Sequence, residues 1–163
     1  MTQTQETVTI PRENYIFMKI VIVGSIVNSD KLIELGKKLE TFGVEVELPY
    51  CTMQVKNGEF TLEELTKRKE AEGDGFFRKQ ASEDLIKRYN RLICEGDRVL
   101  VANFDKKDQK NYIGGNALME MGFAYVNDKP LYILNEIPQN NYTDEILAMK
   151  PIVLHGNLEG VVK

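Results

Sequence analysis

The chain is poor in the residue types from which proteins build most transition-metal centres. Its 163 residues include one histidine, two cysteines and no tryptophan. Cys51 and Cys94 stand apart with no Cys-x-x-Cys pair, and His155 has no second histidine to join it, which excludes a zinc site of Cys and His ligands. We therefore expect no metal and no cofactor. Two isolated thiols also indicate a reducing, cytoplasmic compartment.

The chain also lacks long hydrophobic runs and an excess of positive charge. No apolar run approaches the roughly 18 residues of a membrane span, and residues 1–14 lack the apolar stretch of a secretory signal. A formal net charge of −4 argues against nucleic acid and membrane surfaces as partners. A hydrophobic content of 42% predicts one domain with a sizeable core. We expect a flexible leader at 1–14 and a single domain at 15–163, with an insertion at about 50–80.

Apolar runs alternate along the chain with amphipathic segments. Strands are predicted at 16–24, 44–48, 97–104, 129–134 and 151–154. Helices are predicted from Ser29 or Asp30 to about 42, within 62–72 of the insertion, at 82–94, from the glycine pair at 114–115 to about 126, and at 143–149. The runs are typical of buried parallel strands joined by right-handed crossovers. The predicted fold class is α/β: a three-layer, flavodoxin/Rossmann-like sandwich with a mostly parallel five-stranded sheet.

The junction between the predicted strand at 97–104 and the helix after it is the most informative segment. Gly114 and Gly115 are followed by a polar Asn116 and then by good helix formers, so backbone N–H groups point at whatever binds there. A single acid, Glu120, follows among Met, Gly and Phe residues. In parallel sheets ligands sit beyond the carboxyl ends of the strands. Gly24, Ser25 and Asn103 lie at such ends and are candidate binding residues.

Four short motifs, in this segment and elsewhere in the chain, form a pattern: Gly24-Ser25-Ile26, Gly96-Asp97, Glu120-Met121-Gly122-Phe123-Ala124-Tyr125 and Lys129-Pro130. Together they resemble the nucleoside 2-deoxyribosyltransferase-like superfamily, which includes the 2'-deoxynucleoside 5'-phosphate N-hydrolases. The resemblance implies that Glu120 is a nucleophile that attacks C1' of a deoxyribosyl group and forms a glycosyl-enzyme ester. It implies a sugar or phosphate contact for Gly24 and Ser25.

Two positions depart from the pattern of that superfamily. Tyr89 stands where several relatives carry an acid, and Gly114 stands where transferases carry Asp and nucleotide hydrolases carry Ser. The group that protonates the leaving base is therefore not identified. Asn111 and Asn116 could supply the polar contacts instead.

Two readings of function remain open. The chain is either an enzyme that cleaves or transfers the N-glycosidic bond of a 2'-deoxynucleoside or its 5'-monophosphate, or a non-catalytic nucleotide-binding or sensing domain. In the second reading the chain has kept the fold but lost the helper acid, which fits Tyr89 and Gly114. As separate alternatives, Glu120 is an ordinary solvated helix residue and the glycine pair serves packing alone. By resemblance we expect a nucleoside or nucleotide as the small-molecule partner. We also expect a homo-oligomer with a shared active site, and Asn140, Asn141 or Met149 near the interface.

Overall fold

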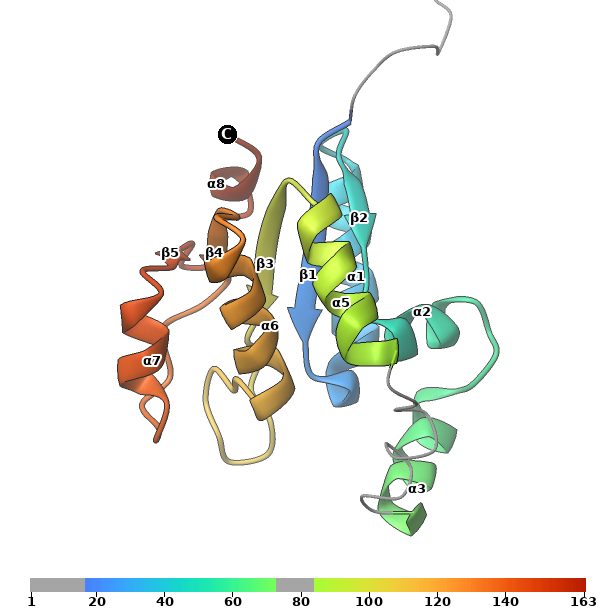
Figure 1. Ribbon diagram of the computed structural model, residues 1–163. Coiled ribbons are helices and arrows are strands. Elements are labelled where there is room, and N and C mark those ends of the chain that lie inside the picture. Colours follow the sequence, from blue (N-terminus) through green and yellow to red (C-terminus); the bar gives the residue numbers. More distant parts are fainter. Residues whose placement is uncertain (1–16, 73–83) are drawn as a thin grey trace, which may run out of the picture.

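The computed structural model describes residues 17–72 and 84–163. The predicted leader at 1–14 and residues 73–83 at the end of the predicted insertion lie outside these residues. Within them the chain forms one parallel sheet with helices on both of its faces (Figure 1).

The sheet has five strands in the order β2-β1-β3-β4-β5, and every pair is parallel. Its strands are β1 (Lys19–Gly24), β2 (Glu45–Glu47), β3 (Arg98–Ala102), β4 (Leu131–Ile133) and β5 (Ile152–Val153). The predicted α/β class and the Rossmann/flavodoxin-like architecture are confirmed. β1, β3 and β4 are the interior strands of the sheet, and their apolar residues are buried on both faces.

Helices connect successive strands and cover the sheet. They are α1 (Ser29–Glu40), α2 (Tyr50–Lys56), α3 (Leu62–Glu72), α5 (Asp84–Glu95), α6 (Gly115–Val126), α7 (Thr143–Ala148) and α8 (Glu159–Val162). A short 3₁₀ turn at Ile26–Asn28 precedes α1. The predicted helices are confirmed, with ends that shift by a few residues. α2 and α8 are short helices that the hydrophobic pattern does not predict, because seven and four residues are too few to establish a helical period.

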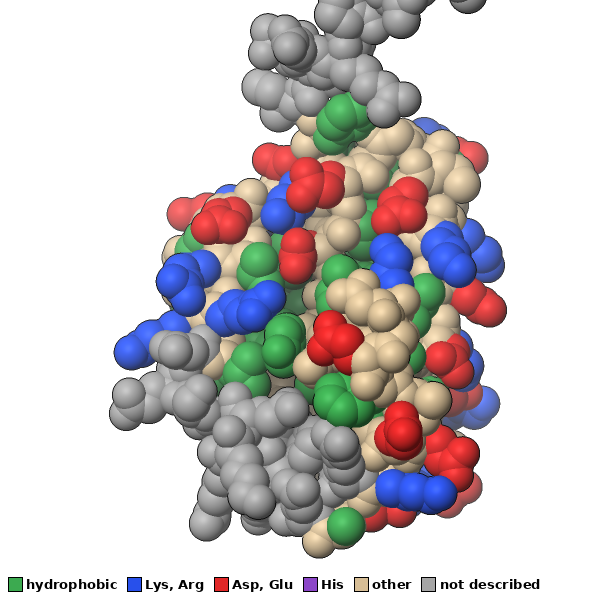
Figure 2. Space-filling model, turned by 90° about the vertical axis from the view of Figure 1, so that its right-hand side faces the viewer, with side chains coloured by type: hydrophobic (Ala, Val, Ile, Leu, Met, Phe, Trp, Pro, Cys, Tyr) green, Lys and Arg blue, Asp and Glu red, His purple; other side chains and the backbone are tan. Residues whose placement is uncertain are grey.

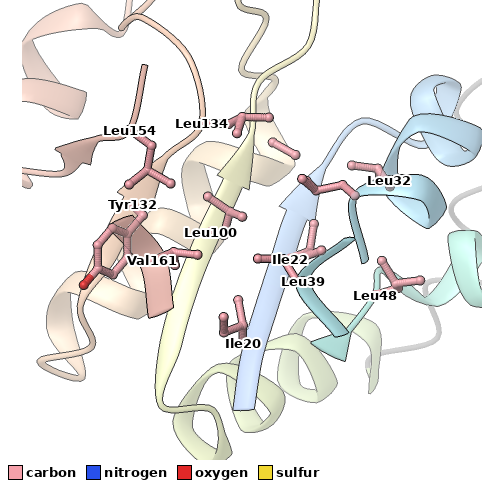
Figure 3. Close-up of a cluster of buried hydrophobic side chains, with 12 residues drawn as sticks. Ile20, Ile22, Leu32, Leu39, Leu48, Leu100, Tyr132, Leu134, Leu154 and Val161 are labelled. Atoms are coloured by element: carbon pink, nitrogen blue, oxygen red, sulfur yellow. The ribbon is translucent and has the colours of Figure 1, made fainter. Parts of the chain in front are cut away.

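Side chains of the strands alternate between two hydrophobic cores. On one face Ile20, Ile22 and Leu100 pack with Leu32 and Leu39 of α1, as Figure 3 shows. On the other face the cluster joins the alternate positions of β1, β3 and β4 to buried residues of α5, α6 and α7: Val21, Val23, Val99, Val101, Ile93, Ala117, Met121, Ala124, Leu131, Ile133 and Ile146. α1 therefore lies on one side of the sheet, and α5, α6 and α7 lie on the other.

Charges of both signs are interspersed on the face of the molecule drawn in Figure 2. Cys51 and Cys94 are not joined by a disulfide, and Cys51 is buried whereas Cys94 is exposed. None of the helices in residues 17–72 and 84–163 combines the length and the apolar composition that crossing a bilayer requires.

Candidate functional site

The order of the strands places a crevice at the carboxyl ends of β1 and β3. These strands are neighbours, yet the helices that follow them, α1 and α6, pack on opposite faces of the sheet. Loops that leave a parallel sheet in opposite directions open a crevice between them, and this is where such folds bind ligands. Gly24 and Ala102 are paired at the last position of the register, so Gly24, Ser25 and Asn103 lie at this point as predicted.

Gly24 has a clear packing role at the crevice. A Cβ atom built on Gly24 would lie 2.9 Å from Leu32 Cδ2 and 3.3 Å from the Ala102 carbonyl oxygen. The strand therefore passes close to α1 and β3 only because this residue has no side chain. The half-buried Ser25 begins the next turn, in which its carbonyl accepts a 2.9 Å hydrogen bond from the Asn28 amide.

Asn103 is fully buried, and its side-chain amide joins the ends of two strands. Its Nδ2 donates to the Glu136 carbonyl at 2.8 Å, and its Oδ1 accepts from the Asn135 backbone N–H at 2.9 Å. A buried amide with both ends bonded is stable and rigid. Asn103 thus shapes the edge of the crevice by holding the β4 exit in place.

Glu120 lies on α6 and is buried, with 7% of the residue exposed. Among residues 17–72 and 84–163 the carboxylate has no hydrogen-bond or ion-pair partner. Burial raises the pKa of the Glu120 carboxyl to about 8, because a charge loses its hydration there and no cation among the described residues compensates. An unpaired buried carboxyl is costly to a fold, so it marks a candidate functional group.

Tyr89 is the neighbour of Glu120 that the structure identifies. It lies on α5, and its hydroxyl oxygen accepts a 2.8 Å hydrogen bond from the Tyr50 backbone N–H at the start of α2. The pKa of this phenol is raised, first by burial and then by the negative charge of Glu120. Because the oxygen accepts from a backbone N–H, the hydroxyl proton remains available for donation to another acceptor.

The two glycines at the start of α6, Gly114 and Gly115, line a different hollow. An open groove of about 780 Å³ lies between the β3–α6 loop and the loop after β4, and its walls are residues 108–115 and 137–142. Gly114 is covered by the Tyr112 side chain, whose hydroxyl would lie 2.7 Å from an added Cβ, whereas Gly115 faces open space. Asn116 is exposed and lies outside the groove lining.

The predicted site residues therefore fall into separate groups. Gly114 and Gly115 line the groove, Gly24, Ser25 and Asn103 lie at the strand ends, and Glu120 is buried beside α5 and absent from the groove lining. The sequence predicts that Tyr89 faces inward from its helix and marks it as a departure from the superfamily pattern, but it does not connect Tyr89 with Glu120. The position of Tyr89 four residues before the buried Ile93 was the available signal that it faces inward.

His155 and any clustered metal-binding side chains are the remaining candidates for catalysis or metal binding. His155 is exposed, and its Nδ1 lies 2.5 Å from Glu136 Oε1 at the surface. In the part of the chain that the structure describes, no cluster of three His, Cys, Asp or Glu side chains could hold a metal ion.

Comparisons with protein-family models, with curated proteins and with solved structures found no match for this chain.

Proposed function

We propose that this protein cleaves or transfers the N-glycosidic bond of a 2'-deoxynucleoside or its 5'-monophosphate, with Glu120 as the nucleophile. The observation that carries the proposal is the buried Glu120 near the Tyr89 phenol, on the helix that follows the parallel strand β3. Among the residues that the structure describes, this carboxylate has no hydrogen-bond or ion-pair partner. Resemblance of the motif Glu120–Tyr125 to the deoxyribosyltransferase-like pattern supplies the reaction class. The substrate partner is a small nucleoside or nucleotide.

The chemistry proceeds in two displacements. The Glu120 carboxylate attacks C1' while the bond from C1' to the base nitrogen breaks, and the electron pair leaves with the base, which takes up a proton. Water or a second base then attacks C1' and displaces the carboxylate, which restores Glu120. A nearby carboxylate stabilises the oxocarbenium-like transition state of each step.

The raised pKa of Glu120 predicts how the activity depends on pH. The nucleophile must be ionised, and burial holds the pKa of Glu120 at about 8. The pH profile of kcat/KM reports the pKa of this group in the free enzyme. We therefore expect kcat/KM to rise with pH up to about pH 8, where Glu120 becomes ionised, and to stay constant above it. Tyr89, whose hydroxyl proton is not used in the hydrogen bond from the Tyr50 N–H, is our candidate for donation to the leaving base.

A second candidate is a non-catalytic nucleotide-binding or sensing domain. At pH 7 a carboxyl group whose pKa is about 8 is mainly neutral, and it then serves as a hydrogen-bonding group for a ligand. Gly114 in place of a polar residue also favours this candidate.

The test is a panel of deoxynucleosides and their 5'-monophosphates, incubated with and without an acceptor base. Released and exchanged bases are separated by chromatography for the wild type, Glu120→Ala and Glu120→Gln. Glu34→Gln is the matched control, because Glu34 is an exposed acid on α1. Turnover that disappears only in the Glu120 variants supports the enzyme. Binding without turnover, unchanged in Glu120→Gln, would favour the sensing domain.

A further inference from the structure

The proposed reaction does not use the open groove between the β3–α6 loop and the loop after β4. The volume of this groove is about 780 Å³, and neither Glu120 nor Tyr89 belongs to its lining. The lining is rich in side-chain amides, which both loops supply: Gln109, Asn111, Gln139, Asn140 and Asn141. A hollow of this size with convergent polar groups is a candidate site for a second ligand.

The charges of the groove do not favour an anionic ligand. Lys110, the cation of the lining, has its Nζ 2.6 Å from Asp105 Oδ2, so this charge is already paired. The ammonium of Lys106, in the same loop, lies 4.3 Å from the centre of the Tyr112 ring. Asp108 adds a negative charge to the lining. A phosphate group would therefore find no unpaired cation in this lining, and an uncharged ligand fits it better.

The amide side chains are available to such a ligand. Within residues 17–72 and 84–163, the side chains of Gln109, Asn111, Gln139 and Asn141 make no hydrogen bond to another residue. Each amide carries N–H donors and a carbonyl acceptor, and a hydroxyl group also both donates and accepts. The row of amides is therefore matched to a ligand that presents several hydroxyl groups.

Tyr142 adds an aromatic surface to the same wall as Asn141. It is 42% exposed, so a large part of its side chain is open to a ligand. The face of an aromatic ring is negative, and C–H groups, which are weakly positive, pack favourably on it. A sugar ring has hydroxyl groups at its rim and C–H groups on its faces, and it can therefore use both the amides and the tyrosine.

Hydrogen bonds within each loop hold both walls in place. In the first wall Asp105 Oδ1 accepts from the Asn111 backbone N–H at 2.9 Å. In the second wall Asn140 Oδ1 accepts from the Tyr142 backbone N–H at 2.8 Å, and the Asn140 N–H donates to Thr143 Oγ1 at 2.9 Å. Walls that are fixed before binding lose little conformational freedom when a ligand arrives.

We propose that this groove binds a neutral oligosaccharide. Its hydroxyl groups pair with the amides of Asn111, Gln139 and Asn141, and one of its rings packs on Tyr142. Because the groove is open to solvent, it accommodates a chain longer than one sugar ring. The site is separate from the proposed glycosidic chemistry, since Glu120 does not line the groove.

Saturation-transfer NMR tests the proposal by detecting which sugar protons contact the protein. The protein is mixed in turn with cellohexaose, maltohexaose and the hexamer of N-acetylglucosamine. We expect the wild type to transfer magnetisation to at least one of these sugars. Tyr142→Ala and Asn141→Ala should each lose most of this signal, whereas Tyr142→Phe, which keeps the ring, should retain it.

Two variants on α6 are matched controls. Tyr125 and Asn116 are exposed residues of the same types that lie outside the groove lining. Tyr125→Ala and Asn116→Ala should therefore transfer magnetisation to the sugar as the wild type does. Glu120→Gln should also bind the sugar normally, so a loss of glycosidic activity and a loss of sugar binding are separate results.

Three outcomes would overturn the proposal. The first is no transfer to any of the three sugars. The second is transfer that persists in both Tyr142→Ala and Asn141→Ala, which would place the sugar elsewhere on the protein. The third is displacement of the sugar by a 2'-deoxynucleoside 5'-monophosphate, which would show that the groove belongs to the site of the proposed substrate.

Discussion

The hydroxyl oxygen of Tyr89 lies 2.8 Å from the backbone nitrogen of Tyr50, whose hydrogen bond it accepts. This contact ties the first turn of α2 to α5. The Arg88 guanidinium adds to it by lying 4.7 Å from the centre of the Tyr50 ring. The segment after β2 is therefore anchored to the helix that carries the neighbour of Glu120.

Replacing Tyr89 by phenylalanine tests this anchor. The change leaves the Tyr50 N–H without its partner, so we expect the free energy of unfolding to fall by about 1–3 kcal/mol. Urea denaturation of the variant and the wild type measures the difference. Tyr142→Phe is the control: because Tyr142 is 42% exposed, this substitution should hardly change the free energy of unfolding. Equal stability of the two variants would mean that the contact contributes nothing.

The pKa of Glu120 predicts how stability changes with pH. Burial raises the pKa from 4.5 to about 8 in the folded chain, so between these values the folded state keeps a proton that the unfolded state releases. The stability of the wild type should therefore fall as pH rises through this window, by an amount on the order of 4 kcal/mol. Glu120→Gln carries no titrating group at this position and should lack the fall.

The measurement is the free energy of unfolding of both proteins at pH 4.5 and pH 8.5. As pH rises, the free energy of unfolding of Glu120→Gln should increase relative to that of the wild type. The free energy of unfolding of Glu34→Gln, which changes an exposed residue, should equal that of the wild type at both pH values. If the wild type and Glu120→Gln keep a constant difference, the carboxyl has an ordinary pKa and the burial argument fails.

Asn103 provides a test of the crevice edge. Asn103→Leu keeps the approximate volume but leaves the Asn135 N–H and the Glu136 carbonyl without a partner in a buried place. We expect a loss of about 2–4 kcal/mol in the free energy of unfolding. Asn116→Leu changes the same residue type at an exposed position and should cost less than about 0.5 kcal/mol. Similar losses for both would show that the bridge is unimportant.

The sheet could be predicted from the sequence because its strands are buried on both faces. The run at 16–24 is rich in β-branched residues and the run at 97–104 has an apolar centre, and they become the neighbouring interior strands β1 and β3. The burial of Glu120 also follows from its position, because Ala117, Met121 and Ala124 define the inner side of the same helix.

The arrangement of the site could not be predicted in the same way. The Tyr89 hydrogen bond depends on where α2 packs, and α2 begins in a polar insertion with no hydrophobic period. Gly114 and Gly115 follow strand β3, as expected, yet the long loop between β3 and α6 carries them into a groove that excludes Glu120. Loop paths depend on side-chain contacts such as Tyr112 over Gly114, which no spacing rule contains.

Gly24 gives a final test of how tightly the crevice is built. Gly24→Ala places a methyl group 2.9 Å from Leu32 Cδ2 and 3.3 Å from the Ala102 carbonyl oxygen, so the buried Leu32 side chain must move and the contact with the β3 backbone becomes tight. We expect a loss of about 1–3 kcal/mol in the free energy of unfolding. Gly115→Ala is the matched control, because its methyl group meets open space and should leave stability nearly unchanged. Adding Leu32→Val, which shortens the side chain in the way, should recover part of the loss in Gly24→Ala. A larger combined loss would show that the carbonyl, not the leucine, sets the limit.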